Sequence, residues 1–381
     1  MAENTSFYAS QLRSELVRRN RLYARGRAHV ESYGAAPVIV YAPENDRHGN
    51  FFDAAYAAIM QRPDWLKRFD KVHAQARRSL PKAERRWREL DSSMSSDALL
   101  MNVFCTPGVV ESRAVRNALG LDANAIPAFG WRARVPLVNG RFDRTEVDMR
   151  LGTLLVEAKL TEGDFQTCFE EVVEAYRDFD EVFDRALLPR VEIVVSRRKE
   201  AVEFPEDYTQ EYEEPIADPS AALKGHGFSR ADRLPENEPA LAAEGMPFDE
   251  ELSQQGLKPQ HVYARDAARL KPCPFKDTTS HADTRCGYAG YQLIRNVLAA
   301  QADGSSFCVL LDERRPDLRE TWFQVMAAVK SSELRVRLKT LTWQELAVLL
   351  PEDLQEFLDV KYGIVAPGQI ASPIEETGEN E

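Results

Sequence analysis

The stretch TEVDMRLGTLLVEAK, residues 145–159, decides the fold. It contains two strand-like runs on either side of Leu151-Gly152, where a tight turn is expected. Side chains in a strand alternate between its two faces, and the turn sets the two strands side by side. The alternation gives two pairs of charged side chains, each on one face of its strand: Glu146 with Asp148, and Glu157 with Lys159. The stretch therefore predicts a β-hairpin that brings three carboxylates and one ammonium group together.

This set of side chains suits hydrolysis of a phosphodiester bond. Two carboxylates can hold a hard cation such as Mg²⁺, which prefers oxygen ligands. The metal polarises the phosphate and lowers the pKa of a bound water, and a neighbouring lysine can orient that water and stabilise charge in the transition state. A lone Glu-x-Lys is usually a solvated strand face. Here, however, Glu157 ends an apolar run, and a charge at the end of such a run needs an explanation.

Helices and strands alternate along the rest of the chain, which is typical of an α/β protein with a mixed central sheet flanked by helices. The helical patterns cover 8–34, 51–90, 98–104, 111–119, 165–186, 288–301, 317–330 and 343–361. The strand patterns cover 131–138, 144–151, 153–160, 191–195, 307–311 and 334–341.

The chain divides by composition into four parts: a helical N-terminal region at 1–90, a core at 91–200 and 257–366, an acidic insertion or linker at 201–256, and a disordered tail at 367–381. The insertion carries 14 acidic and 3 basic side chains and so accounts for nearly all of the net charge of −12. The remainder is close to balanced, with arginine clusters at 13–27 and 62–88 that could contact a polyanion or lie on solvated helix faces.

Asp148 followed by Glu157-Ala158-Lys159 resembles the signature of the PD-(D/E)XK nuclease superfamily. Two longer stretches resemble one branch of it, a group of bacterial restriction endonucleases: SSMSSDALLMN at 92–102, and TEVD at 145–148 leading into EAKLTE at 157–162. The resemblance covers roughly residues 45–200. It implies a restriction-endonuclease-like fold and a Mg²⁺- or Mn²⁺-dependent DNA endonuclease of restriction or defence. By this resemblance Asp148 and Glu157 would bind the metal, and Lys159 would be catalytic.

Residues near this motif are weaker candidates for the site. Val147 stands where the superfamily often has proline. Glu146 could support the metal ligands or pair with an arginine, and Gln166 could face the site from the start of the next helix, although a surface position is favoured. Asp97 is expected to cap its helix rather than bind metal. On the helix at 288–301, Tyr291 and Gln292 could touch substrate, although packing against the sheet is favoured.

The five cysteines show no strong metal-binding spacing and are expected to be reduced thiols: Cys105, Cys168, Cys273, Cys286 and Cys308. A zinc ion or an iron–sulfur cluster near Cys273, His281 and Cys286 is a disfavoured alternative. No glycine-rich phosphate loop is present, so ATP dependence is not supported.

Two other functions stay open at this stage: a non-catalytic nucleic-acid-binding protein that kept the fold, and an iron–sulfur repair nuclease. The expected partner is DNA. A homodimer would suit an enzyme that cuts both strands, and a restriction role would need a separate methyltransferase. No apolar stretch is long enough for a membrane helix and the N-terminus has no signal-peptide pattern, so a cytoplasmic location is expected.

Overall fold

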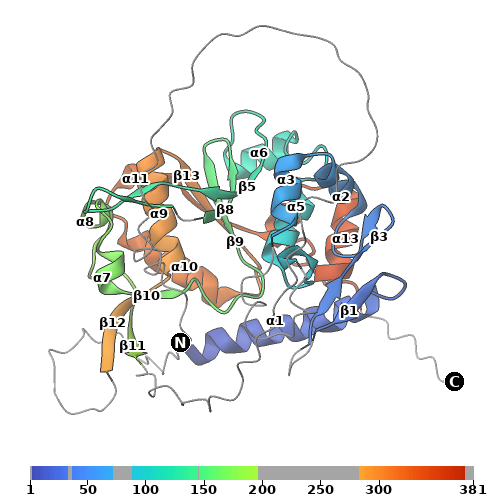
Figure 1. The fold of residues 1–381 in the computed structure, drawn as a ribbon, viewed down its shortest axis with the longest axis horizontal. Helices are drawn as coiled ribbons and strands as arrows, with labels where there is room; N and C mark the ends of the chain where they lie inside the picture. The colour runs from blue at the N-terminus through green and yellow to red at the C-terminus, as the bar shows by residue number, and fades with distance from the viewer. Residues whose placement is uncertain (1, 33–36, 72–87, 145, 196–282, 374–381) are drawn as a thin grey trace, which may run out of the picture. The chain divides into compact units, whose positions relative to one another are not determined.

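The computed structural model describes residues 2–32, 37–71, 88–144, 146–195 and 283–373 (Figure 1). These residues lie in the unit formed by Met1–Val194 and Tyr263–Glu381, with only Val195 beyond it. The expected acidic insertion at 201–256 lies outside the described residues. None of the described helices is long and apolar enough to cross a membrane.

The centre of the fold is a five-stranded mixed sheet. Its order is β14 (Leu338–Thr342), β13 (Ser306–Leu311), β9 (Leu154–Ala158), β8 (Glu146–Leu151) and β5 (Ala128–Arg132). β13 runs parallel to both β14 and β9, whereas β8 is antiparallel to β9 and β5. The predicted α/β class with a mixed central sheet flanked by helices is confirmed.

The predicted hairpin is formed by β8 and β9. Leu151 lies opposite Leu154, so the loop is two residues long. Gly152 has a φ of 60°, a left-handed conformation that glycine adopts without steric cost. The local sequence therefore sets the register of the two strands that carry the charged side chains.

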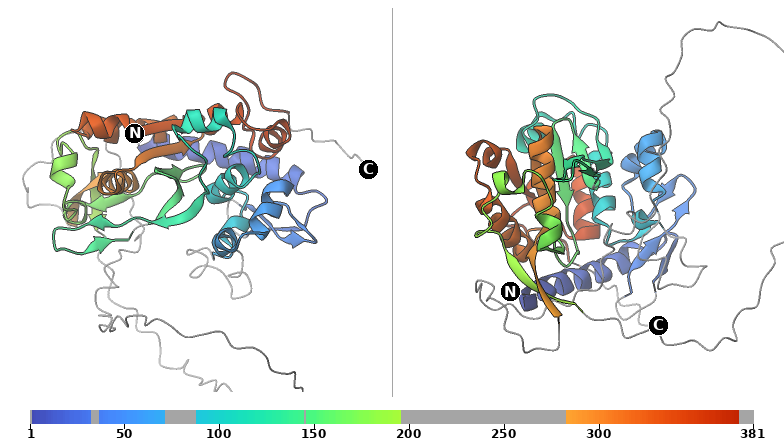
Figure 2. Two further views of the ribbon diagram at one scale, coloured as in Figure 1. Left: turned by 90° about the horizontal axis from the view of Figure 1, so that it is seen from above. Right: turned by 60° about the vertical axis from the view of Figure 1, so that its left-hand side comes forward.

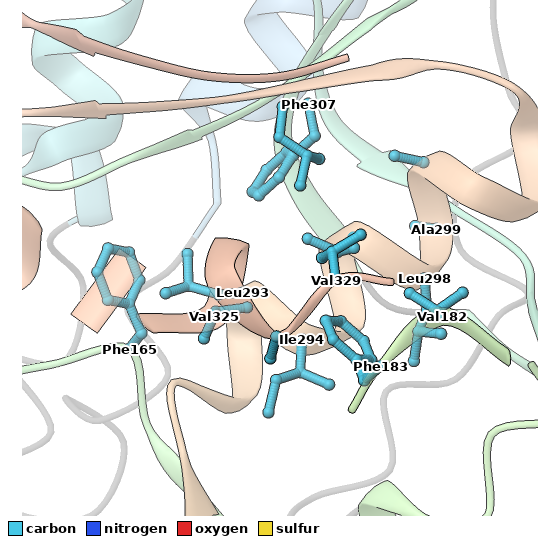
Figure 3. Packing of buried hydrophobic residues seen from close by; sticks show 14 of the residues in the cluster. Phe165, Val182, Phe183, Leu293, Ile294, Leu298, Ala299, Phe307, Val325 and Val329 are labelled. Carbon is cyan, nitrogen blue, oxygen red and sulfur yellow. The ribbon is translucent and has the colours of Figure 1, made fainter. Parts of the chain in front are cut away.

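Helices cover both faces of the sheet. α9 (Tyr291–Asp303) and α10 (Pro316–Ala328) pack on one face, and Figure 3 shows Phe307 of β13 over side chains of these two helices. The other face is covered by α1 (Ala2–Tyr23), α5 (Ser96–Phe104), α12 (Trp343–Ala347) and α13 (Glu352–Tyr362). α1 also touches α10 and runs along one side of the layers (Figures 1 and 2). Because helices cover both faces of the sheet, β13 is apolar on both faces. Burial of each of its aliphatic or aromatic side chains stabilises the fold by roughly 1.5–3 kcal/mol.

The N-terminal region is not purely helical, so the predicted helix at 8–34 is too long. α1 ends at Tyr23, and Gly26 then adopts a φ of 73°. Four short strands follow: β1 (His29–Glu31), β2 (Ile39–Tyr41), β3 (Pro43–Glu44) and β4 (Arg47–His48). Residues 29–31 pair antiparallel with the strand-forming residues Ile39, Val40 and Tyr41, which the helical pattern of the arginines did not indicate.

The predicted helix at 51–90 is also interrupted. Its described part consists of α2 (Asp53–Met60), α3 (Pro63–Phe69) and a short 3₁₀ turn, η1 (Glu89–Asp91). Pro63 occupies the first turn of α3, a position that proline tolerates because it lacks a backbone N–H. Helices α5 and α6 (Arg113–Leu119) confirm the predictions at 98–104 and 111–119.

The predicted helix at 165–186 is wrong. The segment forms β10 (Thr167–Phe169) and two single turns, α7 (Glu170–Val173) and α8 (Phe179–Val182). β10 pairs with β12 (Asp283–Ala289), which pairs with β11 (Arg190–Val195) in a second sheet. Pairing with a strand more than a hundred residues away overrides the local helical pattern.

The C-terminal part otherwise follows the prediction, with two departures. The expected strand at 334–341 is divided into α11 (Ser332–Val336) and β14. Residues 367–373 of the expected disordered tail are held against α13, because Ser372 donates through its N and Oγ to Asp359 (2.9 and 2.5 Å).

Candidate active site

Asp148 and Glu157 lie where strands β8 and β9 separate. The backbone pairing ends at Met149 and Val156, and the next step in register places Asp148 opposite Glu157. At that step the N–H of Ala158 donates to Oδ2 of Asp148 (2.8 Å). The Asp148 carboxylate thus lies between the two strands where they diverge, beside the Glu157 carboxylate.

The Glu157 carboxylate is buried and held on both oxygens. Nζ of Lys159 donates to Oε1 (2.8 Å), and Nδ2 of Asn296 donates to Oε2 (2.8 Å). Asn296 projects from α9 and is fully buried. Its Oδ1 has no hydrogen-bond partner among the described residues. Sequence analysis selected Tyr291 and Gln292 on this helix and missed Asn296, since only the packing of α9 on the sheet brings it to Glu157.

No described contact joins Tyr291 or Gln292 of α9 to the carboxylates of the site. The Tyr291 hydroxyl lies 3.0 Å from the hydroxyl of Tyr176. The backbone N–H of Gln292 donates to the carbonyl of Phe165 (3.0 Å). Tyr291 packs against the core cluster, and Gln292 anchors the start of the helix through its backbone.

The site carries an excess of negative charge. Burial raises the pKa of Asp148 well above its usual value, and the neighbouring carboxylates Glu157 and Asp97 raise it further. Burial alone would lower the pKa of Lys159, but Glu157, Glu162 and Asp148 outweigh it, and the pKa is raised. The site therefore favours additional positive charge and keeps its lysine protonated.

Asp97 does not cap α5, which corrects the expectation from the sequence. The N-cap is Ser95, whose side chain accepts from the N–H of Ala98 (3.1 Å). Asp97 is buried and pairs with Nη2 of Arg68 (2.5 Å). Burial raises its pKa to about 6, with Arg68 opposing the shift. The position of Asp97 also contributes to the raised pKa of Asp148, so the first helix of the core does bring an acid to the site.

Glu146 is paired with basic residues rather than left free beside Asp148 and Glu157. Oε1 accepts from Nη1 of Arg68 (2.5 Å) and from Nζ of Lys71 (2.9 Å). Burial would raise the pKa of Glu146, but Lys71 and Arg68 lower it below its usual value. Arg68 therefore bridges Glu146 of β8 and Asp97 of α5.

Gln166 does not begin a helix. It is exposed, has a φ of 63°, and precedes β10. Its backbone carbonyl accepts from the N–H of Tyr291 (3.0 Å). No described contact joins its side chain to the carboxylates.

The loop that follows Lys159 is fixed by two side chains from the C-terminal part. Nε1 of Trp343 donates to the Lys159 carbonyl (3.0 Å). The fully buried Arg315 donates to the carbonyls of Leu160 (3.3 Å), Glu162 (2.6 Å) and Gly163 (3.1 Å). Its charge is balanced by Asp317 (2.8 Å). Sequence analysis did not identify Arg315, which lies in an ordinary loop before α10.

The donor set at the site fits a divalent cation with oxygen ligands. Asp148 and Glu157 supply carboxylates, and after burial the repulsion from Glu157 is the next cause that raises the pKa of Asp148, which a cation between the two would relieve. Among the described residues, no group of three or more His, Cys, Asp and Glu side chains is arranged around a common point. A metal here would therefore rest on two carboxylates and keep several water ligands, as Mg²⁺ commonly does.

The described cysteines do not form a cluster. Cys105, Cys168 and Cys308 are free, buried and located in three different apolar clusters. Cys286 is disulfide-bonded, so the expectation of five reduced thiols is wrong for this residue. Cys273 and His281 lie outside the described residues. The described cysteines lend no support to an iron–sulfur cluster or a zinc site.

A large cavity of about 1120 Å³ lies elsewhere, between α1, the β3–β4 segment and α13. Its lining includes Tyr23, Arg27, Phe52 and Phe357, and none of the residues of the candidate site. The candidate site is therefore identified by the convergence of charged side chains and not by the size of a cavity.

One family model matches most of the chain. The model of a family described as "Restriction Endonuclease associating with ARP" matches residues 17–244 and 237–363. No curated protein and no solved structure matches the chain. The matched ranges span most of the chain and include every residue of the site. The chain belongs to this family of restriction endonucleases that associate with ARP, and its core is restriction-endonuclease-like.

Proposed function

We propose that the chain is a Mg²⁺- or Mn²⁺-dependent DNA endonuclease that acts in restriction or defence. Membership of a restriction-endonuclease family supports a nuclease. The observation that carries the finer assignment is the convergence of Asp148, Glu157 and Lys159 at the point where β8 and β9 separate.

In this proposal Asp148 and Glu157 hold the metal. When bound, the metal would polarise the scissile phosphate and lower the pKa of a coordinated water. Asn296 fixes the orientation of Glu157 from α9, and the N–H of Ala158 fixes that of Asp148. Carboxylates held in this way need little reordering to bind a cation.

Lys159 acts as a charged donor and not as a general base. Its raised pKa keeps the ammonium group protonated at neutral pH. An ammonium group cannot accept a proton, but it can orient a water and stabilise the negative charge that develops on the phosphate oxygens. Arg315 and Trp343 hold the backbone that carries it.

The test is cleavage of supercoiled plasmid DNA with Mg²⁺ or Mn²⁺. The variants are Glu157→Ala and Lys159→Ala, and the controls are Glu333→Ala and Lys67→Ala, which change exposed residues of the same types. We expect metal-dependent cutting by the wild type and both controls, and none by the two site variants. Equal cutting by all five proteins would sink the site assignment. DNA binding without cutting by any of them would favour a non-catalytic nucleic-acid-binding protein.

A further inference from the structure

A short basic segment lies between the sheet edge and the catalytic strand. Residues 131–144, here called the arginine ribbon, run from the end of β5 through the antiparallel pair β6 (Val135–Pro136) and β7 (Phe142–Asp143) to the start of β8. Its arginines are exposed, and none forms an ion pair with a described residue: Arg132, Arg134, Arg141 and Arg144. The segment contains one acidic residue, Asp143, which accepts from the Tyr176 hydroxyl (2.6 Å), so it keeps a net charge of +3 (4 − 1 = 3) that an external anion can neutralise.

Several arginines of the N-terminal cluster at 13–27 are already engaged. Arg19 pairs with Glu15 (3.0 Å) and Arg21 with Glu31 (3.1 Å). Nε of Arg13 donates to the carbonyl of Thr161 (3.0 Å). The ribbon therefore offers a denser set of guanidinium groups without ion pairs than the cluster at 13–27, one of the two arginine clusters that the sequence indicated.

Aromatic rings accompany the arginines of the ribbon. The guanidinium of Arg134 lies over the ring of Phe142 (4.4 Å), and that of Arg150 on β8 lies over the ring of Trp131 (4.6 Å). Phe142 and Trp131 remain 45% and 37% exposed. Stacking on the Phe142 ring restricts the guanidinium group of Arg134, which forms no ion pair with a described residue, and this lowers the entropic cost of binding an anion. Arg150 is already engaged, because its Nη2 pairs with Asp303 (3.4 Å) and its Nε donates to the carbonyl of Gly152 (3.0 Å).

The ribbon starts close to the candidate active site. Arg132 lies directly opposite Glu146 in the β5–β8 pairing, and directly opposite residues in a ladder share a face. Asp148 follows Glu146 by two residues on the same strand, a separation of about 7 Å. A polyanion that reaches the carboxylates therefore passes beside the first arginine of the ribbon.

We propose that the arginine ribbon binds the sugar–phosphate backbone of duplex DNA beside the bond that is cut. The inference rests on the proposed function and names the surface that holds the substrate. A two-stranded β-ribbon fits the major groove, which is about 12 Å wide, and arginines along such a ribbon face the phosphates of the groove walls. The guanidinium fork matches the phosphate oxygens in bidentate geometry.

The test measures binding of a duplex oligonucleotide in Ca²⁺, at several salt concentrations. The double variant Arg132→Ala/Arg134→Ala is compared with the wild type and with Arg319→Ala/Arg335→Ala. The control removes the same charge from exposed arginines on α10 and α11. Each phosphate contact contributes about 0.9 to the slope of log K against log salt concentration. We therefore expect the slope of the ribbon variant to fall by nearly 2, with a loss of affinity of roughly tenfold or more at about 0.1 M salt, and the control to match the wild type.

Each outcome decides the proposal. Wild-type affinity and salt slope in the ribbon variant would overturn it and leave the arginines as a guard against pairing at the sheet edge. A loss confined to single-stranded DNA would overturn the assignment to duplex DNA. Failure of the wild type to bind any DNA would remove the proposed function and this inference together. Arg132→Gln/Arg134→Gln removes the charge but keeps the first part of the aliphatic chain and a polar end, so the same loss in this folded variant would exclude misfolding as the cause.

Discussion

Asn296→Leu separates metal binding from fold stability. Asn296 donates one hydrogen bond to Oε2 of Glu157, and its Oδ1 is buried without a described partner. Leucine has a similar volume and no polar atom. The substitution therefore removes the hydrogen bond that orients Glu157, and it also removes the unpaired carbonyl.

These two effects act in opposite directions on the free energy of unfolding. A hydrogen bond to a charged group stabilises by about 1.5–3 kcal/mol, and a buried unsatisfied polar group costs about 1–3 kcal/mol. The net change in stability is expected to be within about 1 kcal/mol. Loss of a residue that orients a metal ligand typically costs roughly 10–100-fold in metal affinity or activity. We expect a loss of that size for Mn²⁺ affinity and for the cleavage rate.

The matched control is Asn20→Leu, which changes another fully buried asparagine. Nδ2 of Asn20 donates to the carbonyls of Leu16 (2.9 Å) and Lys361 (3.3 Å), and Oδ1 accepts from the Tyr41 hydroxyl (3.0 Å). Its removal leaves buried partners unsatisfied. We expect a loss of stability of about 2 kcal/mol or more, with Mn²⁺ affinity unchanged.

Two measurements distinguish Asn296→Leu from Asn20→Leu: calorimetry of Mn²⁺ binding, and urea unfolding of each variant. The reasoning fails if Asn296→Leu binds Mn²⁺ as tightly as the wild type and cuts DNA as fast. It also fails if Asn296→Leu loses as much stability as Asn20→Leu, because the unpaired carbonyl would then contribute nothing.

Three further predictions concern the surroundings of the site. Arg68→Met leaves the carboxylates of Asp97 and Glu146 without their bridging cation and should lower the free energy of unfolding in urea by roughly 3–5 kcal/mol. Adding Asp97→Asn should restore part of this loss. A loss below about 1 kcal/mol would contradict the prediction. The pKa of Asp148 is raised and that of Asp97 is about 6, so bound metal displaces protons from the site. Mn²⁺ affinity should therefore rise with pH through about 6, by up to about tenfold per pH unit for each proton displaced. An affinity independent of pH would disprove this linkage. Arg315→Lys keeps the charge, but its three N–H donors lie on one nitrogen and cannot replace the five hydrogen bonds that Arg315 makes to three carbonyls and to Asp317, so we expect slower cleavage and a loss of about 2 kcal/mol or more, against no change if charge alone matters.

Local signals in the sequence sufficed for the central hairpin. Strand alternation, the glycine turn and the apolar run before Glu157 all lie within fifteen residues, and each acts through short-range geometry. The same is true of the helix expected at 98–104, which is α5, although its cap is Ser95 and not the expected Asp97. These features were predicted because no distant part of the chain is needed to form them.

The partners of the charged residues could not be predicted in this way. Asn296 reaches Glu157 from 139 positions away, and Arg68 reaches Glu146 from 78 positions away. β10 became a strand through pairing with β12, against a local helical pattern. Such contacts depend on how distant segments pack, and a single sequence holds no periodic signal for them.

The central sheet joins strands from distant parts of the chain, so the candidate site cannot be completed until late in protein synthesis. β9 pairs with β13, and Glu157, Lys159 and the following loop are held by Asn296, Trp343 and Arg315, all encoded after residue 282. A nascent chain that has reached only Val195 therefore carries its carboxylates on a strand with one open edge and without their supports. Contacts of such long sequence separation form late in folding. If the chain cuts DNA as proposed, we expect fragments released before translation ends to lack the supports of the candidate active site and to be inactive.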